Sequence, residues 1–142
     1  GETLLDAYCG VGTLGLSLVP ERGQLLGIES WPPAVSDARH NASGQARFWQ
    51  GEVEQVLQGE DLQADAIVLD PPRAGCAPEA LEAMADYGAS RIVYVSCDPA
   101  TLSRDIARLN TLGYALRQVQ PVDLFPQTFH IETVVRMSKV DK

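Results

Sequence analysis

Cys97 is the residue of this chain whose type and position most directly offer chemistry. The apolar run 92–95, typical of a buried parallel strand, ends just before it, and Asp98-Pro99 then begins a predicted helix. A thiol at the carboxyl end of a central strand can meet the positive end of the next helix, which lowers its pKa and raises its thiolate fraction. The alternative is a small buried side chain, the commoner role of an arbitrary cysteine.

A short glycine turn and two acidic residues favour a cofactor that contains adenosine. Gly10-Val-Gly12 follows an apolar run and precedes a predicted helix, so a ligand can approach the backbone there. Glu29 ends the next apolar run about 20 residues later, a spacing that suits a carboxylate on a ribose diol. Glu52, after the third run, is either a further cofactor contact or an acid at a helix start.

Two further segments place carboxylates near Cys97. Asp70-Pro71-Pro72 follows the fourth predicted strand, and its prolines predict a stiff loop whose carbonyls are presented rather than paired. Asp70 should face the same crevice as Glu29 and Cys97, because the carboxyl ends of parallel strands share one edge. In the connection before the last strand, His130 and Glu132 are two positions apart and would point to the same face.

Apolar runs alternate with helix-length segments, which predicts a parallel sheet wrapped by helices. The predicted strands are 3–8, 24–28, 46–50, 64–69, 91–95, 114–122 and 131–137, and the predicted helices are 13–19, 32–41, 53–58, 78–87 and 99–112. No helix separates the last two strands, so one of them must run antiparallel. We therefore expect an α/β fold, a seven-stranded, mostly parallel sheet with an antiparallel last strand and helices on both faces.

Composition limits the partners and the location. The 142 residues form one domain with a net charge of −8, which argues against a nucleic-acid surface on this part of the protein. The first 70 residues carry 3 basic and 11 acidic side chains and the rest carry 8 of each, so the second half would better tolerate a polyanion. The three cysteines lack metal-ligand spacing and no apolar run approaches about 20 residues, so we expect a cytoplasmic monomer without metal or membrane segment.

Four motifs resemble those of one enzyme family, in the family's order. They are Asp6-x-Tyr-Cys-Gly-x-Gly12, Asp70-Pro-Pro-Arg-x-Gly75, Val95-Ser-Cys-Asp-Pro-Ala-Thr-x-x-Arg-Asp105 and Phe125-Pro-x-Thr-x-His-x-Glu132. From end to end the chain resembles the catalytic domain of the S-adenosylmethionine-dependent RNA uracil carbon-5 methyltransferases, which have a Rossmann-like class I methyltransferase fold. The last two motifs are most similar to the branch that acts on 23S ribosomal RNA, with a transfer-RNA enzyme as the alternative.

The resemblance implies roles for the matched residues. Cys97 would add as a thiolate to carbon 6 of a uridine, Glu132 would remove the proton from carbon 5, and Asp70 would hold the base. The target uridine would be flipped out of its RNA to reach them. The residues that we expect to contact S-adenosylmethionine are Tyr8, Gly10, Thr13, Glu29, Glu52 and Asp70. At position 13, several family members have Asn instead.

Some parts that the family carries are not found in these 142 residues. They are an upstream helical segment that contributes a glutamine to the cofactor site, an N-terminal RNA-binding domain and, in some members, an iron–sulfur cluster. We therefore expect residues 1–142 to be a catalytic fragment that lacks the cluster and binds cofactor weakly. RNA would be bound mainly through the missing N-terminal part.

Other classes fit the motifs less well. A cytosine carbon-5 methyltransferase carries Pro-Cys where this chain has Pro71-Pro72, and an amino-group methyltransferase has an aromatic residue in place of Arg73. A nicotinamide-dependent oxidoreductase would have a longer glycine fingerprint. A non-catalytic cofactor-binding domain would have no use for both Cys97 and Glu132.

Overall fold

The computed structural model describes residues 1–123 and 131–141. The described elements are β1 (Thr3–Asp6), α1 (Thr13–Leu18), β2 (Gln24–Glu29), α2 (Pro32–Asn41), β3 (Ala46–Gln50), α3 (Val53–Gly59), β4 (Ala66–Leu69), α4 (Pro78–Tyr87), β5 (Arg91–Ser96), α5 (Pro99–Thr111), β6 (Tyr114–Val122) and β7 (Glu132–Lys139). Every predicted strand and helix is confirmed, with ends that differ by one or two residues. At the first strand the difference places Tyr8 in the turn that follows β1 rather than within the strand.

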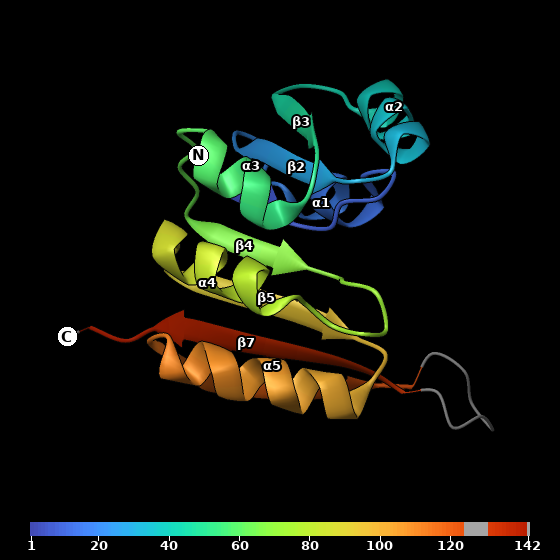
Figure 1. Ribbon diagram of the computed structural model, residues 1–142. Helices are drawn as coiled ribbons and strands as arrows, with labels where there is room; N and C mark the ends of the chain where they lie inside the picture. The colour runs from blue at the N-terminus through green and yellow to red at the C-terminus, as the bar shows by residue number, and fades with distance from the viewer. Residues whose placement is uncertain (124–130, 142) are drawn as a thin grey trace.

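The seven strands form one sheet in the order β3-β2-β1-β4-β5-β7-β6 (Figure 1). The pairs among β1 to β5 are parallel, and β7 runs antiparallel to both of its neighbours. The expected antiparallel last strand is therefore confirmed. From β1, successive strands are added toward one edge of the sheet as far as β3, and from β4 they are added toward the other edge. The boundary between β1 and β4 is therefore a topological switch point, where open α/β folds bind ligands.

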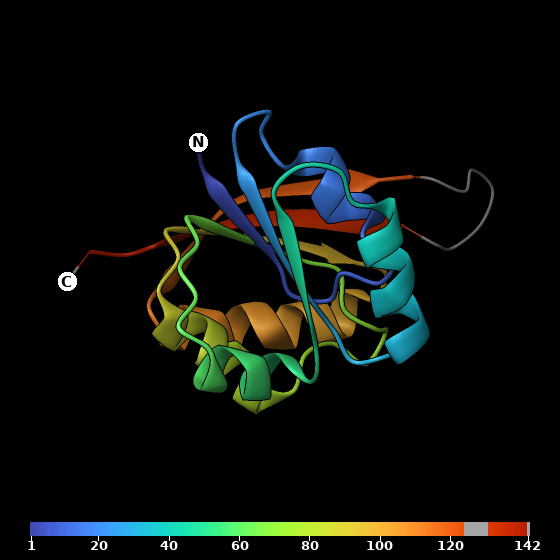
Figure 2. The same ribbon diagram turned by 90° about the horizontal axis from the view of Figure 1, so that it is seen from above.

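Helices cover both faces of the sheet. On one face α1 and α2 pack over β1, β2 and β3, in a core that includes Val35, Ala38 and Phe48. On the other face the larger core joins α3, α4 and α5 to the sheet, with Met84 and Leu109 fully buried. Figure 2 shows α3, α4 and α5 together on one side of the strands. Burial of apolar surface on both faces is what holds the sheet between two helical layers.

Local sequence sets where the helices near the carboxyl edge begin and end. Pro78 and Pro99 stand in the first turns of α4 and α5, where a missing backbone N–H costs nothing. Gly88 ends α4 in a left-handed conformation with φ of 82°. Asp98 caps α5, since its carboxylate accepts hydrogen bonds from the first backbone amides of the helix. Pro78, Pro99 and Asp98 fix the helix starts that border the site, and Gly88 turns the chain back to the amino edge of the sheet, where β5 begins.

Candidate active site

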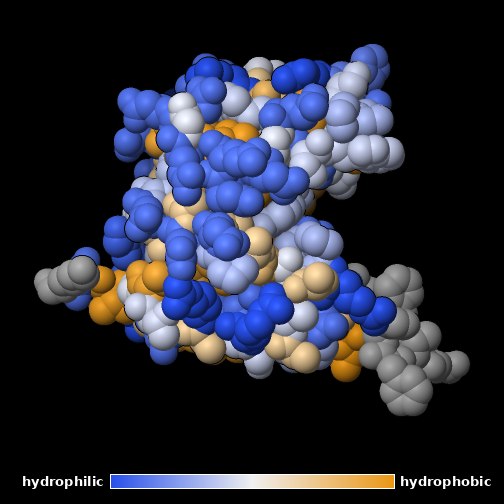
Figure 3. Space-filling view, viewed as in Figure 1, coloured by the Kyte–Doolittle hydropathy of each residue, from blue (hydrophilic) through white to orange (hydrophobic). Residues whose placement is uncertain are grey.

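A cavity of about 790 Å³ opens at the carboxyl ends of β1, β2, β3 and β4. Its volume is in the range of small-molecule and cofactor sites. The surface is hollowed at this edge, between the part built on β1 to β3 and the part built on α5 and the last strands (Figure 3). All six predicted cofactor residues line the cavity: Tyr8, Gly10, Thr13, Glu29, Glu52 and Asp70. Strand ends far apart in sequence therefore supply one site.

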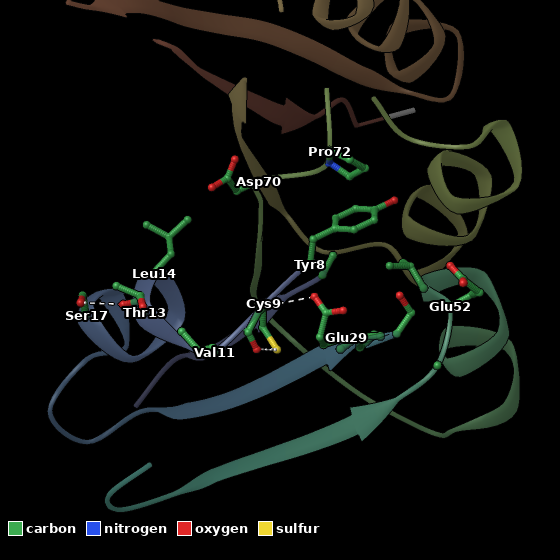
Figure 4. A pocket seen from close by; sticks show the side chains of 16 residues that line it. Tyr8, Cys9, Val11, Thr13, Leu14, Ser17, Glu29, Glu52, Asp70 and Pro72 are labelled. Carbon is green, nitrogen blue, oxygen red and sulfur yellow. Dashed lines mark hydrogen bonds between the residues drawn. The ribbon is translucent and has the colours of Figure 1, made fainter. Parts of the chain in front are cut away.

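Glu29 ties the glycine turn to the start of α2. One carboxylate oxygen accepts a hydrogen bond from the Gly10 amide at 3.2 Å, and the other accepts one from the Trp31 amide at 2.7 Å. Gly10 has a φ of 54°, and a Cβ placed on it would have no heavy atom within 4 Å, so open space lies before its backbone. Figure 4 shows the Glu29 side chain inside the cavity beside this turn. The carboxylate has lone pairs left for a ligand.

Asp6 is a buried carboxyl behind the glycine turn, and sequence reasoning assigns it no role beyond its place in a motif. It is 1% exposed, and its Oδ2 accepts a hydrogen bond from the Gly15 amide in α1 at 3.0 Å. A Cβ on Gly15 would stand 2.8 Å from that oxygen, so the glycine lets α1 approach β1. Burial raises the pKa of Asp6 to about 6. Gly15, a glycine in the first turn of a predicted helix, is the sequence feature that could have identified this close contact.

Glu52 and Tyr8 border the cavity from different strands. Glu52 is the N-cap residue directly before α3, but its side chain makes no capping hydrogen bond to that helix within the described residues. It lines the cavity instead, which favours a ligand contact over a capping role. Tyr8 lies between Asp70 and Glu52 in Figure 4. Burial and then the neighbouring Cys76 raise the pKa of Tyr8, so its phenol stays neutral and can donate a hydrogen bond.

The loop after β4 differs from the sequence prediction. The two prolines predict a loop whose backbone carbonyls accept no hydrogen bonds within the protein, and this prediction is wrong. Pro72 O accepts from the Gly75 amide at 2.8 Å, Arg73 O from Thr101 Oγ1 at 3.0 Å, and Ala74 O from Arg104 Nη2 at 2.9 Å. Prolines remove donors from a loop, but they leave its carbonyls free to bind side chains of a neighbouring helix. The loop is stiff because α5 holds it.

Cys97 is exposed, whereas Cys9 and Cys76 are buried. The interpretation of Cys97 as a small core residue is therefore excluded. The residues on either side of it close a tight turn, in which Ser96 Oγ accepts from the Asp98 amide at 3.1 Å and lies 3.0 Å from the Asp98 carbonyl, to which it donates. The thiol thus lies on an accessible turn whose backbone is fixed.

Glu132 begins β7, and because β7 is antiparallel its start lies at the carboxyl edge of β4 and β5. Ser96 pairs with Thr133 at the end of the β5–β7 ladder. The ladder ends there, so Cys97, directly after β5, and Glu132, directly before Thr133, lie at the same end of this strand pair. Burial and then the charge of Glu132 raise the pKa of Asp70, so these two carboxyl groups are near enough to interact.

The three predicted catalytic residues therefore share one edge. Asp70 also lines the cavity itself, together with Pro72 of the same loop. Phe125, Thr128 and His130 of the fourth motif lie outside the described residues. Among residues 1–123 and 131–141, no three carboxylate, histidine or cysteine side chains are grouped as metal ligands. No helix in this part is long and apolar enough to span a bilayer.

The fold is a Rossmann-like class I methyltransferase fold, as the solved structures similar to it show. The structure of the tRNA (uracil-54, C5)-methyltransferase of Pyrococcus abyssi with S-adenosyl-L-homocysteine superposes with a TM-score of 0.85 and 34% identity, covering 96% of this chain and 34% of that chain. A TehB-like methyltransferase of Corynebacterium glutamicum shares the fold with a TM-score of 0.77, at 23% identity over 98% of this chain and 80% of that one.

Sequence comparison gives the family. The tRNA (uracil-5-)-methyltransferase family model matches residues 50–140, and this chain belongs to that family. It is 50% identical to an uncharacterized RNA methyltransferase of Gloeobacter violaceus, over 97% of this chain and 31% of the relative. It is 45% identical to one of Bacillus cereus, over 99% of this chain and 32% of the relative. The chain thus spans about a third of the length of these relatives.

Proposed function

We propose that this chain is the catalytic domain of an enzyme that transfers a methyl group from S-adenosylmethionine to carbon 5 of a uridine in RNA. The observation that carries the proposal is the placement of Cys97, Asp70 and Glu132 at one edge of the sheet, beside the cavity at the β1–β4 switch point. An exposed thiol, a proton acceptor and a carboxyl that can hydrogen-bond a base are the groups that methylation at carbon 5 needs.

The cavity suits S-adenosylmethionine better than a dinucleotide. S-adenosylmethionine supplies, when bound, a methyl group activated by a positively charged sulfur. Glu29, Glu52 and Asp70 give the cavity wall an acidic character, and Asp6 lies just behind it. Such a wall favours a ligand with sulfonium and ammonium groups and disfavours a pyrophosphate. Glu29 at the end of β2 is placed to accept from a ribose diol, and the open backbone at Gly10 admits the ligand.

The reaction begins and ends on Cys97. Its thiolate forms a bond to carbon 6 of the uracil, and the electron pair of the 5,6 double bond moves toward oxygen 4 as an enolate. Carbon 5 of this enolate then bonds to the methyl group, whose bond to the sulfonium sulfur breaks as S-adenosylhomocysteine leaves. Glu132 accepts the proton that carbon 5 still carries, the double bond re-forms, and the thiolate leaves carbon 6. Asp70 holds the uracil edge so that carbon 5 faces the cavity.

Glu132 and Cys97 need to face the same side of the base for this sequence. The β5–β7 ladder supports this arrangement, because its last pair, Ser96 and Thr133, directly adjoins both residues. Glu132 is half-buried at the start of β7, on the edge that also carries Asp70. We infer that Cys97 adds to the base and that Glu132, by removing the proton from carbon 5, completes the release of the base from Cys97.

We propose 23S ribosomal RNA as the substrate, on the wording of the third and fourth motifs. Transfer RNA is the second candidate, because the Pyrococcus abyssi enzyme that is 34% identical to this chain methylates uracil 54 of transfer RNA. The net charge of −8 indicates that either RNA would be held mainly by other parts of the protein. Mapping 5-methyluridine in both RNAs from cells with and without the gene distinguishes the two.

The central experiment traps the covalent step. The complete gene product is incubated with S-adenosylmethionine and an RNA that contains 5-fluorouridine. A base cannot remove fluorine from carbon 5 as it removes a proton, so Cys97 cannot be eliminated. The enzyme–RNA bond should therefore persist through denaturing electrophoresis. Cys97→Ala should form no adduct, while Cys76→Ala, which removes a buried thiol, should still form it. Adduct formation that is undiminished in Cys97→Ala would contradict the assignment of the nucleophile.

A further inference from the structure

One face of α5 contacts the loop that carries Asp70. Thr101, Arg104 and Asp105 lie three and four positions apart, so they share that face of the helix. Thr101 Oγ1 donates to Arg73 O at 3.0 Å, and Arg104 Nη2 donates to Ala74 O at 2.9 Å. The loop backbone therefore rests on side chains of the helix that begins next to Cys97.

Asp105 is the buried centre of this contact. It is 1% exposed, and its Oδ2 accepts from the Cys76 amide at 2.9 Å and from Tyr94 Oη at 2.6 Å. Its Oδ1 accepts from Arg104 Nε at 3.1 Å and Nη2 at 3.0 Å. A buried carboxylate with this many donors is fixed in place and orders the groups that donate to it. One of those groups, Cys76, belongs to the loop, and another, Tyr94, belongs to β5.

Gly75 is what allows the loop to lie this close. Its φ is +78°, and a Cβ on it would stand 2.6 Å from both Arg104 Nη2 and Asp105 Oδ2. The loop backbone therefore packs directly against the side chains of α5. Small relative movement of the two would break several hydrogen bonds at once.

The start of the same helix holds the Cys97 turn. Asp98 Oδ1 accepts from the Ala100 amide at 2.9 Å and the Thr101 amide at 3.2 Å. Asp98 Oδ2 also lies 4.0 Å from Arg73 Nε of the Asp70 loop. Both reactive segments are thus attached to the first two turns of one helix, although they follow different strands.

We propose that Arg104 and Asp105 are positioning residues that hold the Asp70 loop in register with the Cys97 turn. The inference rests on the proposed function. Neither residue lines the cavity, so both act through the groups they hold. A misplacement of about 1 Å between reacting groups can cost about a hundredfold in rate. Asp70 and Pro72 of this loop line the cavity, but its Glu29, Gly10 and Glu52 side is built on β1, β2 and β3, away from α5, so loss of the pair should lower cofactor affinity less than it lowers the rate.

The test compares four forms of the complete gene product: wild type, Asp105→Asn, Arg104→Ala and Arg104→Lys. The rate of adduct formation is measured with saturating S-adenosylmethionine and a 23S ribosomal or transfer RNA transcript that contains 5-fluorouridine. We expect Asp105→Asn and Arg104→Ala to lower this rate by about ten- to a hundredfold. Arg104→Lys should retain part of it, because an ammonium can still donate to one of the acceptors. The dissociation constant of S-adenosylhomocysteine, measured by calorimetry, should change less than about threefold.

Arg108→Ala is the matched control. Arg108 lies one turn further along α5 and pairs with Glu82 of α4, not with the loop. Equal rates for Arg104→Ala and Arg108→Ala would overturn the inference. So would a loss of cofactor affinity as large as the loss of rate, which would mean a general loss of structure. No adduct with the wild-type protein on either RNA would instead refute the proposed function, and this inference with it. Arg104 is exposed, so its variants keep the test decisive if Asp105→Asn does not fold.

Discussion

Burial and the charge of Glu132 together raise the pKa of the Asp70 carboxyl, although one residue directly follows β4 and the other begins β7. The two groups meet because β7 enters the sheet antiparallel, next to β5, which brings its start to the edge where the parallel strands end. Two nearby carboxylates disfavour each other's charge. The same closeness is what the proposed function requires, in which Glu132 reaches a base that Asp70 holds.

Replacing Glu132 should stop the reaction after methyl transfer. We expect Glu132→Gln to keep the size of the side chain but lose the proton acceptor, so the methylated RNA stays bonded to Cys97. Loss of a general base typically costs about 10² to 10⁴ in rate. The measurement is mass spectrometry of the protein–RNA adduct formed with ordinary uridine-containing RNA. Normal turnover by Glu132→Gln would exclude this role, and Glu79→Gln, an exposed acid in α4, serves as the control.

Glu29 should determine cofactor affinity. Glu29→Gln keeps only one good acceptor for the Gly10 and Trp31 amides, and it weakens any bond to a ribose diol. Hydrogen bonds to charged groups contribute about 1.5–3 kcal/mol, so we expect a dissociation constant for S-adenosylmethionine raised by about ten- to a hundredfold. Calorimetric titration measures it. Glu21→Gln, an exposed acid that does not line the cavity, should bind as the wild type does.

Asp6 should make the domain less stable as the pH rises. Burial raises its pKa from 3.8 to about 6, so between these values the folded state binds more protons than the unfolded state. The contribution of neutral Asp6 is fully present below about pH 4 and is lost as the pH passes about 6, by about 3 kcal/mol. Asp6→Asn should remove this loss. Urea unfolding of both proteins between pH 4 and pH 7 measures the difference, and Asp37→Asn, at an exposed position in α2, controls for removal of a charge.

Gly15 should not tolerate a side chain. A Cβ there would stand 2.8 Å from both Asp6 Oδ2 and Leu25 Cδ1, so Gly15→Ala must push α1 away from β1 and β2. We expect a loss of about 1–3 kcal/mol in the free energy of unfolding. Gly59→Ala is the matched change, because Gly59 ends α3 with no atom within 4 Å of its Cβ position. It should be neutral or stabilising. Equal effects of the two substitutions would contradict the steric explanation.

The sequence by itself determined the order and kind of the elements, and for a clear reason. Apolar runs such as Ile92 to Val95 can only be buried strands, and Pro78, Gly88 and Asp98 mark helix ends through effects on the nearest backbone groups. The residues that line the cavity were also predictable, because each follows a strand, and parallel strands end at the same edge. These are local signals, readable one segment at a time.

Only the tertiary structure decided how the segments meet. The ladder that brings Glu132 to the same edge as Cys97 depends on β7 inserting between β5 and β6, which no local pattern encodes. The pairing of the Asp70 loop with Arg104 and Asp105 was likewise hidden, and the expectation of unpaired carbonyls was wrong. Side chains of one helix satisfy a loop that precedes it by a whole strand and helix, and such contacts exist only once the chain has folded.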